Sequence, residues 1–350
     1  MKKIRVKICG YGERYENPRS NYFYKTLEKF YEVELSENPD YVFYIDSSFE
    51  HLKYRDCVKI FYTGENISPN FNLCDYAVGC DYVEFGDRFY RLPVYLVAVF
   101  YQPKELEQAG TIDLKKSKIF TKDDLRKKLE FCSFVYSNYR SDKSRKIIFD
   151  KFSTYKKVNS GGGYLNNVGG RIDNKLEFEA KHKFSIAFEN SSRSGYTTEK
   201  IVCSLVADTI PIYWGNPDIG REFNIKRFIN CHDYKSFDDV VERIKEIDQN
   251  DDLYLSIINE PVLAEGYDFQ KVRDGFGVFL RHIIEQPINT ARRRTINSAR
   301  AIDLEKRERM IAWYVWWKNL IWRMLARAYR PFKKLRFLEK IKCAYYLNQK

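Results

Sequence analysis

Apolar and polar positions alternate along the first part of the chain in short runs that are typical of strands. The runs Ile4–Cys9, Asp40–Ile45 and Val58–Tyr62 predict three strands, and Asn21–Tyr31 has the apolar spacing of a helix. The third strand stops at the turn sequence Thr63–Asn66. Strands separated by helical stretches form parallel sheets covered by helices, so this part of the chain is predicted to be an α/β domain.

A second unit of the same kind begins near residue 131. The apolar spacing predicts strands at Cys132–Tyr136, Phe184–Phe188, Thr209–Trp214 and Phe228–Cys231, and helices at Arg145–Phe152, Thr198–Val206 and Phe237–Ile247. We therefore predict two α/β domains, 1–130 and 131–290, followed by a tail at 291–350.

The tail differs from both domains in charge. It holds 17 Lys and Arg against 4 Asp and Glu, whereas the first 290 residues are balanced to within one charge. The apolar core Ile311–Trp322 is too short to cross a membrane, and tryptophans at helical spacing within it are typical of interfacial helices. We predict a basic amphipathic helical tail that binds an anionic membrane surface. A helix packed on the two domains is the alternative.

The cysteines and the start of the chain bear on the compartment. The eight cysteines contain no C-x-x-C pair, and scattered thiols fit a reducing cytoplasm. The segment Met1–Gly10 lacks the apolar core of a signal peptide. We expect a bacterial cytoplasmic protein that is peripheral on the inner face of the cytoplasmic membrane.

Candidate chemistry is concentrated after the strand Phe184–Phe188. A polar loop follows, and the next helix opens at Thr197–Lys200. Ligands of parallel sheets sit beyond the carboxyl ends of the strands, where helix N-termini attract anions. Lys200 would add a positive charge for a diphosphate, and Glu189 and Glu199 would accept hydrogen bonds from sugar hydroxyls. An ordinary helix cap uses the same residue types, so both interpretations stay open from the residues alone.

The sequence also bears on metal use. It contains no Asp-x-Asp pair, with which many sugar-nucleotide transferases hold a divalent metal ion on the pyrophosphate. Lys, Arg and backbone donors are then the expected partners of a diphosphate. We expect no obligatory cofactor and no metal ligand, and whether a divalent metal stimulates activity is left open.

Four separate segments carry longer motifs: Phe188–Ser191, Tyr196–Lys200, Thr209–Gly215 and Val58–Phe71. The first three resemble the donor-site signature of the α-1,3/1,4-fucosyltransferases, glycosyltransferase family 10. The fourth resembles the N-terminal domain of the bacterial, Helicobacter-type members. The resemblance covers roughly residues 1–290, and several motifs in one order make it specific.

The resemblance implies a GT-B fold, in which two Rossmann-like domains face a cleft. The C-terminal domain would bind GDP-fucose and the N-terminal domain an oligosaccharide acceptor. Glu65 would be the general base, although a turn carboxylate that caps nearby N–H groups is the plainer interpretation of that residue alone. The implied donor-binding residues are Arg145, Glu189, Asn190, Tyr196, Glu199 and Lys200.

The implied reaction is the inverting transfer of L-fucose to a hydroxyl of an N-acetylglucosamine-containing glycan. N-acetyllactosamine, an α-1,3 linkage and a Lewis-type antigen on lipopolysaccharide are the bacterial case that the family implies. Gly195 stands where many members have Asp, and Thr197 where an aliphatic residue is usual. The tail has no clear heptad repeats, which puts repeat-mediated dimerisation in doubt.

Two alternatives are kept. A GT-B transferase could use another nucleotide sugar or acceptor, because a diphosphate site does not identify the sugar. A non-enzymatic protein that binds membrane or nucleic acid through its basic tail would leave the motifs at Glu65 and Tyr196–Lys200 unexplained. We therefore expect no nucleic-acid partner.

Overall fold

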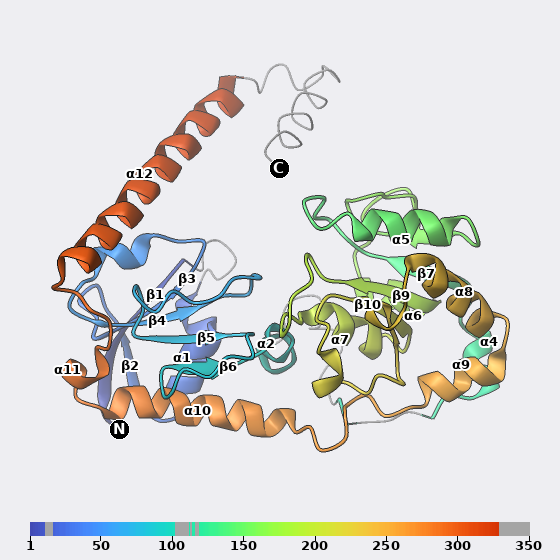
Figure 1. Ribbon diagram of the computed structural model, residues 1–350, viewed down its shortest axis with the longest axis horizontal. Coiled ribbons are helices and arrows are strands. Elements are labelled where there is room, and N and C mark those ends of the chain that lie inside the picture. Colours follow the sequence, from blue (N-terminus) through green and yellow to red (C-terminus); the bar gives the residue numbers. More distant parts are fainter. Residues whose placement is uncertain (11–16, 102–111, 113, 116–118, 329–350) are drawn as a thin grey trace.

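The computed structural model describes residues 1–10, 17–101, 112, 114–115 and 119–328, which form two parallel sheets (Figure 1). The N-terminal sheet has the order β2-β1-β3-β4-β5-β6. Its strands are β1 (Lys3–Cys9), β2 (Glu32–Leu35), β3 (Tyr41–Ile45), β4 (Val58–Tyr62), β5 (Tyr76–Gly79) and β6 (Phe89–Arg91). The C-terminal sheet has the order β11-β10-β9-β7-β8. Its strands are β7 (Glu130–Phe134), β8 (Val158–Ser160), β9 (His182–Phe188), β10 (Ile210–Trp214) and β11 (Ile229–Asn230).

Helices cover the sheets and join them. Those between and around the strands are α1 (Tyr22–Leu27), α2 (Val94–Tyr101), α4 (Lys122–Arg126), α5 (Ser144–Ser153), α6 (Lys175–Ala180), α7 (Glu199–Val206), α8 (Phe237–Asp248) and α9 (Asp251–Ile258). Three more close the described chain: α10 (Phe269–Glu285), α11 (Ile288–Ala291) and α12 (Ala299–Ala328). The predicted α/β class is confirmed, and each sheet is fully parallel among the described strands.

Strand β4 shows how alternation builds the N-terminal core. Val58, Ile60 and Tyr62 face the main apolar cluster, whereas Phe61 faces a second cluster on the other side of the sheet. Successive strand side chains point to opposite faces, so a strand with apolar residues on both faces must be covered on both. The carboxyl end of β4 therefore emerges at a fixed place, three residues before Glu65.

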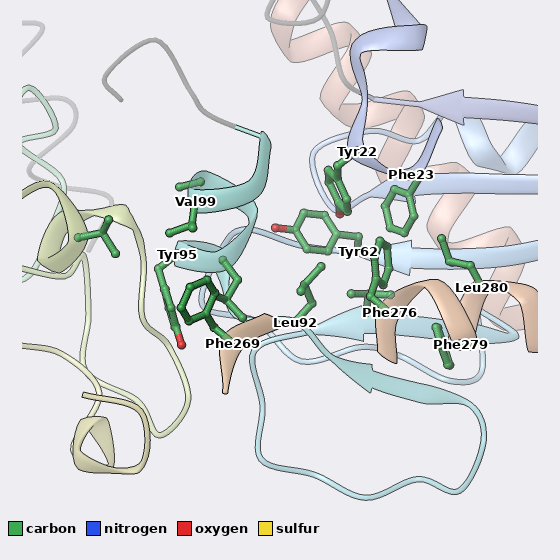
Figure 2. Packing of buried hydrophobic residues seen from close by; sticks show 14 of the residues in the cluster. Tyr22, Phe23, Tyr62, Leu92, Tyr95, Val99, Phe269, Phe276, Phe279 and Leu280 are labelled. Atoms are coloured by element: carbon green, nitrogen blue, oxygen red, sulfur yellow. The ribbon is translucent and has the colours of Figure 1, made fainter. Parts of the chain in front are cut away.

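Helix α10 corrects the domain division of the sequence analysis, which placed residues 131–290 together. The helix packs on the N-terminal unit, where Phe276 lies 5.5 Å from Phe23 and 5.9 Å from Tyr22 between ring centroids (Figure 2). The hydroxyl of Tyr41 donates to the carbonyl of Ile284 at 3.3 Å. Each buried aromatic side chain stabilises this contact by about 1.5–3 kcal/mol. The chain thus crosses back to the first sheet after α9.

The start of the tail also belongs to the N-terminal unit. Ala291 is fully buried, and the backbone N–H groups of Arg293 and Arg294 donate to one carboxylate oxygen of Asp75, at 2.7 and 2.8 Å. The Arg294 guanidinium pairs with the same buried carboxylate. The predicted tail boundary at residue 291 is therefore too early, because Asp75 needs these partners.

Helix α12 then leaves the rest of the molecule (Figure 1). Arg309 still donates to the carbonyl of Leu52 at 2.6 Å, but farther along the helix Trp313, Trp316 and Trp317 are 65, 58 and 40% exposed. Residues 311–325 are thus not packed on the two units, which argues against that alternative for this segment. No helix of the described residues is long and apolar enough to span a bilayer. Residues 329–350 lie outside the described part.

Candidate active site

The two sheets approach each other through the loops at the carboxyl ends of β4, β5 and β9. Asn66, after β4, donates from its side chain to the hydroxyl of Ser191, after β9, at 2.5 Å. Arg193 pairs with Asp81, after β5, at 2.5 Å and donates to Ser68 at 3.0 Å. Motifs that are far apart in the sequence are therefore joined where parallel sheets place their ligands.

Glu65 lies on this edge and is exposed. Its loop is fixed by the buried Thr63, whose hydroxyl donates to Asp46 at 2.9 Å and accepts the backbone N–H of Glu65, also at 2.9 Å. The negative charge of Glu65 contributes to the raised pKa of Tyr196, after the larger effects of burial and of Glu189. Glu65 is therefore close to the Tyr196–Lys200 motif across the contact between the two units.

Glu189 is completely buried at the carboxyl end of β9. One carboxylate oxygen accepts the backbone N–H of Thr198 and the other accepts the Thr198 hydroxyl, each at 2.7 Å. Lys200 lies 3.1 Å from the second oxygen. The sequence analysis placed Glu189 among the groups that meet the donor. In the structure it caps the start of α7 and holds Lys200, because both oxygens already have partners.

Lys200 and Glu199 form the first turn of α7. Burial alone would lower the pKa of Lys200, but the carboxylates of Glu189 and Glu199 outweigh it and raise that pKa. Burial would likewise raise the pKa of Glu199, but the nearby ammonium groups of Lys200 and Lys175 lower it. Both side chains are therefore charged at neutral pH, at a helix N-terminus that itself favours anions.

Arg145, on α5, is 1% exposed and lies beneath the same loop. Its Nε and Nη2 donate to the carbonyl of Phe188 at 3.2 and 2.8 Å, and Nη2 donates to the side-chain oxygen of Asn190 at 2.9 Å. The guanidinium lies 4.0 Å from the ring centroid of Tyr136. Arg145 and Asn190 thus lie together, with Arg145 as the buried support of the loop.

Tyr196 and Gly195 complete the motif. Tyr196 is 1% exposed, and burial raises the pKa of its hydroxyl. Gly195 has φ +84°, and a Cβ there would collide with the carbonyl oxygen of Cys80 in the N-terminal unit. Glycine at this departure from the family pattern therefore lets the loop approach the first sheet closely.

The sequence analysis missed one cation at this site, Lys175 at the start of α6. Burial would lower its pKa, but Glu179 and Glu199 are among the neighbours that raise it, and its ammonium lies 3.8 Å from Glu179. Lys175, Lys200 and Arg145 each influence the hydroxyl of Tyr136, so three cations converge there. A lysine after an Asn cap is too common a pattern to have drawn attention to it.

The next feature is the placement of the side chains that could ligate a metal ion. Within residues 1–10, 17–101, 112, 114–115 and 119–328, no three His, Cys, Asp or Glu side chains are grouped so that they could hold a metal ion. The described residues offer cations and helix N–H groups to an anion instead.

Two parallel sheets, with a cationic helix start on one and an exposed carboxylate on the other, have the architecture of two Rossmann-like units whose strand ends meet, as in glycosyltransferases of the GT-B class. A model described as Alpha-(1,3)-fucosyltransferase FucT N-terminal domain matches residues 6–98. A model described as Glycosyltransferase family 10 (fucosyltransferase) C-term matches residues 125–259. The chain belongs to glycosyltransferase family 10.

Individual relatives agree with this family. Alpha-(1,3)-fucosyltransferase FucT of Helicobacter pylori is 34% identical over 285 residues, which is 74% of this chain and 59% of the relative. Human 4-galactosyl-N-acetylglucosaminide 3-alpha-L-fucosyltransferase 9 is 29% identical over 132 residues, 36% of this chain and 35% of that protein. The chain thus spans less than two thirds of the length of these relatives.

Solved structures give the same result over a longer stretch. A crystal structure of alpha1,3-fucosyltransferase with GDP is 30% identical with a TM-score of 0.66, and the match covers 80% of this chain and 91% of that one. The corresponding structure with GDP-fucose is 29% identical with a TM-score of 0.65, over 80 and 91%. The predicted GT-B fold is thereby confirmed.

Proposed function

We propose that this protein transfers L-fucose from GDP-fucose to a glycan hydroxyl with inversion at the anomeric carbon. The observation that carries the proposal is the placement of Glu65 beside the Tyr196–Lys200 motif, with the two loops joined by the Asn66–Ser191 hydrogen bond. The relatives named above are α-1,3-fucosyltransferases, and two solved relatives hold GDP and GDP-fucose. The donor and the reaction are inferred from these.

Glu65 is proposed as the general base. It would take the proton of the acceptor hydroxyl as that oxygen attacks the anomeric carbon of fucose. Its exposure leaves it accessible to an acceptor, and the Thr63 hydroxyl holds its backbone in place. Because the donor is β-linked, a single in-line displacement would give an α-fucoside, through an oxocarbenium-like state.

The leaving GDP needs its developing negative charge stabilised. Lys200 at the start of α7 is proposed to bind the diphosphate, with Tyr196, Asn190 and Glu199 as further donor contacts. Arg145 and Lys175 would add positive charge from behind the loop, and Glu189 would fix the position of Lys200. We propose that this set acts without an obligatory metal ion, and activity after chelation of divalent metals tests this.

The acceptor is proposed to be N-acetyllactosamine, joined by an α-1,3 linkage as in Lewis-type antigens on lipopolysaccharide. The name of the human relative supports this, since it specifies a 4-galactosyl-N-acetylglucosaminide. The acceptor would lie on the N-terminal unit, next to Glu65. An α-1,4 linkage is the outcome that analysis of the product linkage would reveal.

The exposed part of α12 is proposed to bind an anionic membrane surface, and we propose the inner face of the cytoplasmic membrane as that surface. Ten large apolar or aromatic side chains between residues 310 and 325 are exposed: Met310, Ile311, Trp313, Tyr314, Trp316, Trp317, Ile321, Trp322, Met324 and Leu325. Soluble proteins rarely expose so large a patch without a partner, and tryptophan prefers the headgroup region.

A donor panel tests the reaction. The purified chain is incubated with N-acetyllactosamine and GDP-fucose, GDP-mannose or UDP-galactose, and the product is analysed by NMR. We expect an α-linked fucoside from GDP-fucose alone. Faster transfer from another nucleotide sugar would show that GDP-fucose is not the preferred donor. A β-linked fucoside would contradict the single-displacement mechanism.

A further inference from the structure

A cavity of about 190 Å³ lies where α12 joins the N-terminal unit. Its lining comes from the segment before β4, from β4 itself and from the root of the tail: Arg55, Asp56, Lys59, Arg294, Ile296, Asn297 and Glu305. Lys59 is the second residue of β4, whereas Glu65 follows the carboxyl end of that strand. The cavity is therefore at the opposite edge of the sheet from the candidate active site, with roughly 10 Å of strand between Lys59 and Tyr62.

Lys59 is an unusual residue to find in this place. It is only 4% exposed, and among the residues that the structure describes its ammonium group has no hydrogen-bond or ion-pair partner. Burial, followed by the charge of Arg294, lowers the pKa of Lys59 to about 8. An ammonium group on a largely buried side chain that faces a cavity can bind an anion that enters that cavity.

The carboxylates near Lys59 are already engaged with arginines. Glu305 lies 2.9 Å from Arg309 and 3.6 Å from Arg55. Asp56 is largely exposed and lies 3.4 Å from Arg292.

Asp75 is completely buried and pairs with Arg294. The Arg294 guanidinium also donates to the carbonyls of Cys57 and Arg55, at 2.9 and 2.7 Å, so its position is fixed. Five cationic side chains thus surround three carboxylates at this junction, and Lys59 is the cation that faces the cavity without a partner among the described residues.

We infer that this cavity binds a phosphate group through Lys59 and Arg55, with the positive charge of Arg294 behind them. A tetrahedral anion offers several acceptor oxygens to donors that converge from different directions, which suits one ammonium and a guanidinium fork. The volume holds one phosphate group with a few waters. The group belongs either to a free phosphate or to a phospholipid, since Trp313 and Trp316 follow Glu305 on the same helix.

Inorganic phosphate tests the site directly. Thermal unfolding of the full chain is followed at pH 7 in a phosphate-free buffer, with saturating GDP so that the donor site is occupied. Added phosphate is expected to raise the midpoint by several degrees in a saturable manner, and chloride at equal ionic strength is not. Lys59→Met removes the ammonium at similar volume, whereas Lys29→Met is the control on an exposed lysine.

Phospholipid vesicles distinguish the source of the group. Flotation with phosphatidylcholine vesicles is compared with flotation when phosphatidic acid is added. The lipid source is supported if Lys59→Met loses vesicle binding several-fold and inorganic phosphate leaves the unfolding midpoint of the wild type unchanged. Free phosphate is supported if it raises that midpoint and Lys59→Met binds vesicles as the wild type does. Arg55→Gln changes an exposed side chain and is expected to weaken either response several-fold. The inference is overturned if neither ligand acts, or if Lys59→Met responds as the wild type does.

Discussion

The Thr198 backbone N–H and hydroxyl both donate to the Glu189 carboxylate, each at 2.7 Å, in a site from which water is excluded. This pair closes the end of β9 onto the start of α7 and holds Lys200 3.1 Å from the carboxylate. Gly215 makes the arrangement possible, because a Cβ there would overlap the Glu189 side chain. The donor-site loop is thus organised by a residue that the ligand need not touch.

Glu189→Gln is expected to lower the free energy of unfolding by about 3 kcal/mol, because the amide group cannot accept both hydrogen bonds and leaves Lys200 less well paired. Thr198→Val removes the hydroxyl, which donates to Glu189 and accepts from the Lys200 ammonium at 2.7 Å, and is expected to cost about 1–2 kcal/mol. Urea unfolding of both variants measures the difference. Equal stability of Glu189→Gln and the wild type would show that the carboxylate does not organise the loop.

Arg145→Lys tests whether Arg145 acts through its geometry as well as its charge. A lysine keeps the charge but cannot form the three bonds to Phe188 and Asn190. We expect GDP affinity to fall about tenfold, in line with the loss of a charge-assisted hydrogen bond. Titration calorimetry with GDP measures this, and Arg140→Lys on the exposed loop before α5 is the control. Unchanged GDP affinity would show that Arg145 contributes only its positive charge and that its hydrogen-bond geometry is not needed.

The sequence predicted β3, β4, β9 and β10, which are mostly apolar and buried on both faces, and β1, in which buried apolar residues alternate with basic ones. Short edge strands escaped prediction: β2 has four residues that are mostly exposed, and β6 has three. Helix α10 was not predicted from the sequence, and its partners on α1 lie more than 200 residues away in the chain. The sequence around such a helix does not show which of the two sheets it packs against.

The motifs in the sequence located the candidate site, but they did not predict the role of each residue within it. Glu189 and Lys200 stood out as charged residues, but only the coordinates show that one caps α7 and pairs with the other. The ion pair between Arg193 and Asp81 joins the two units and has no signal in either segment. Lys59 appeared as one polar position in a strand, and its lack of a partner is a property of the fold.

Truncation tests the corrected boundary of the tail. A chain that ends after Met310 is expected to fold, bind GDP as before and lose binding to anionic vesicles, because the exposed tryptophans are removed. A chain that ends after Thr290 also loses Arg293 and Arg294, and is expected to be less stable by about 3–5 kcal/mol, since Asp75 is left buried without its partners. Circular dichroism and flotation measure the two effects. Full stability of the shorter chain would contradict the role of Arg294.

The pH dependence of stability follows from Lys59. Its pKa is about 8 in the folded state and lies at its ordinary value of 10.5 when unfolded. Between these values the unfolded chain binds more protons, so this group makes stability rise with pH. The groups that act on it are Arg294, Cys57, Glu305 and Asp75. Lys59→Met should therefore be more stable than the wild type by about 3 kcal/mol below pH 8, in phosphate-free buffer, with the advantage vanishing by about pH 10.5. A constant difference across this range would show that Lys59 titrates normally.

The most direct test of the proposed reaction is GDP release from GDP-fucose with and without N-acetyllactosamine, for the wild type, Glu65→Gln and the exposed control Glu84→Gln. We expect release that depends on the acceptor in the wild type and the control. In a folded Glu65→Gln that still binds GDP, it should fall by about 10²–10⁴-fold. Acceptor-dependent release that persists in Glu65→Gln would contradict the role of Glu65 as the general base.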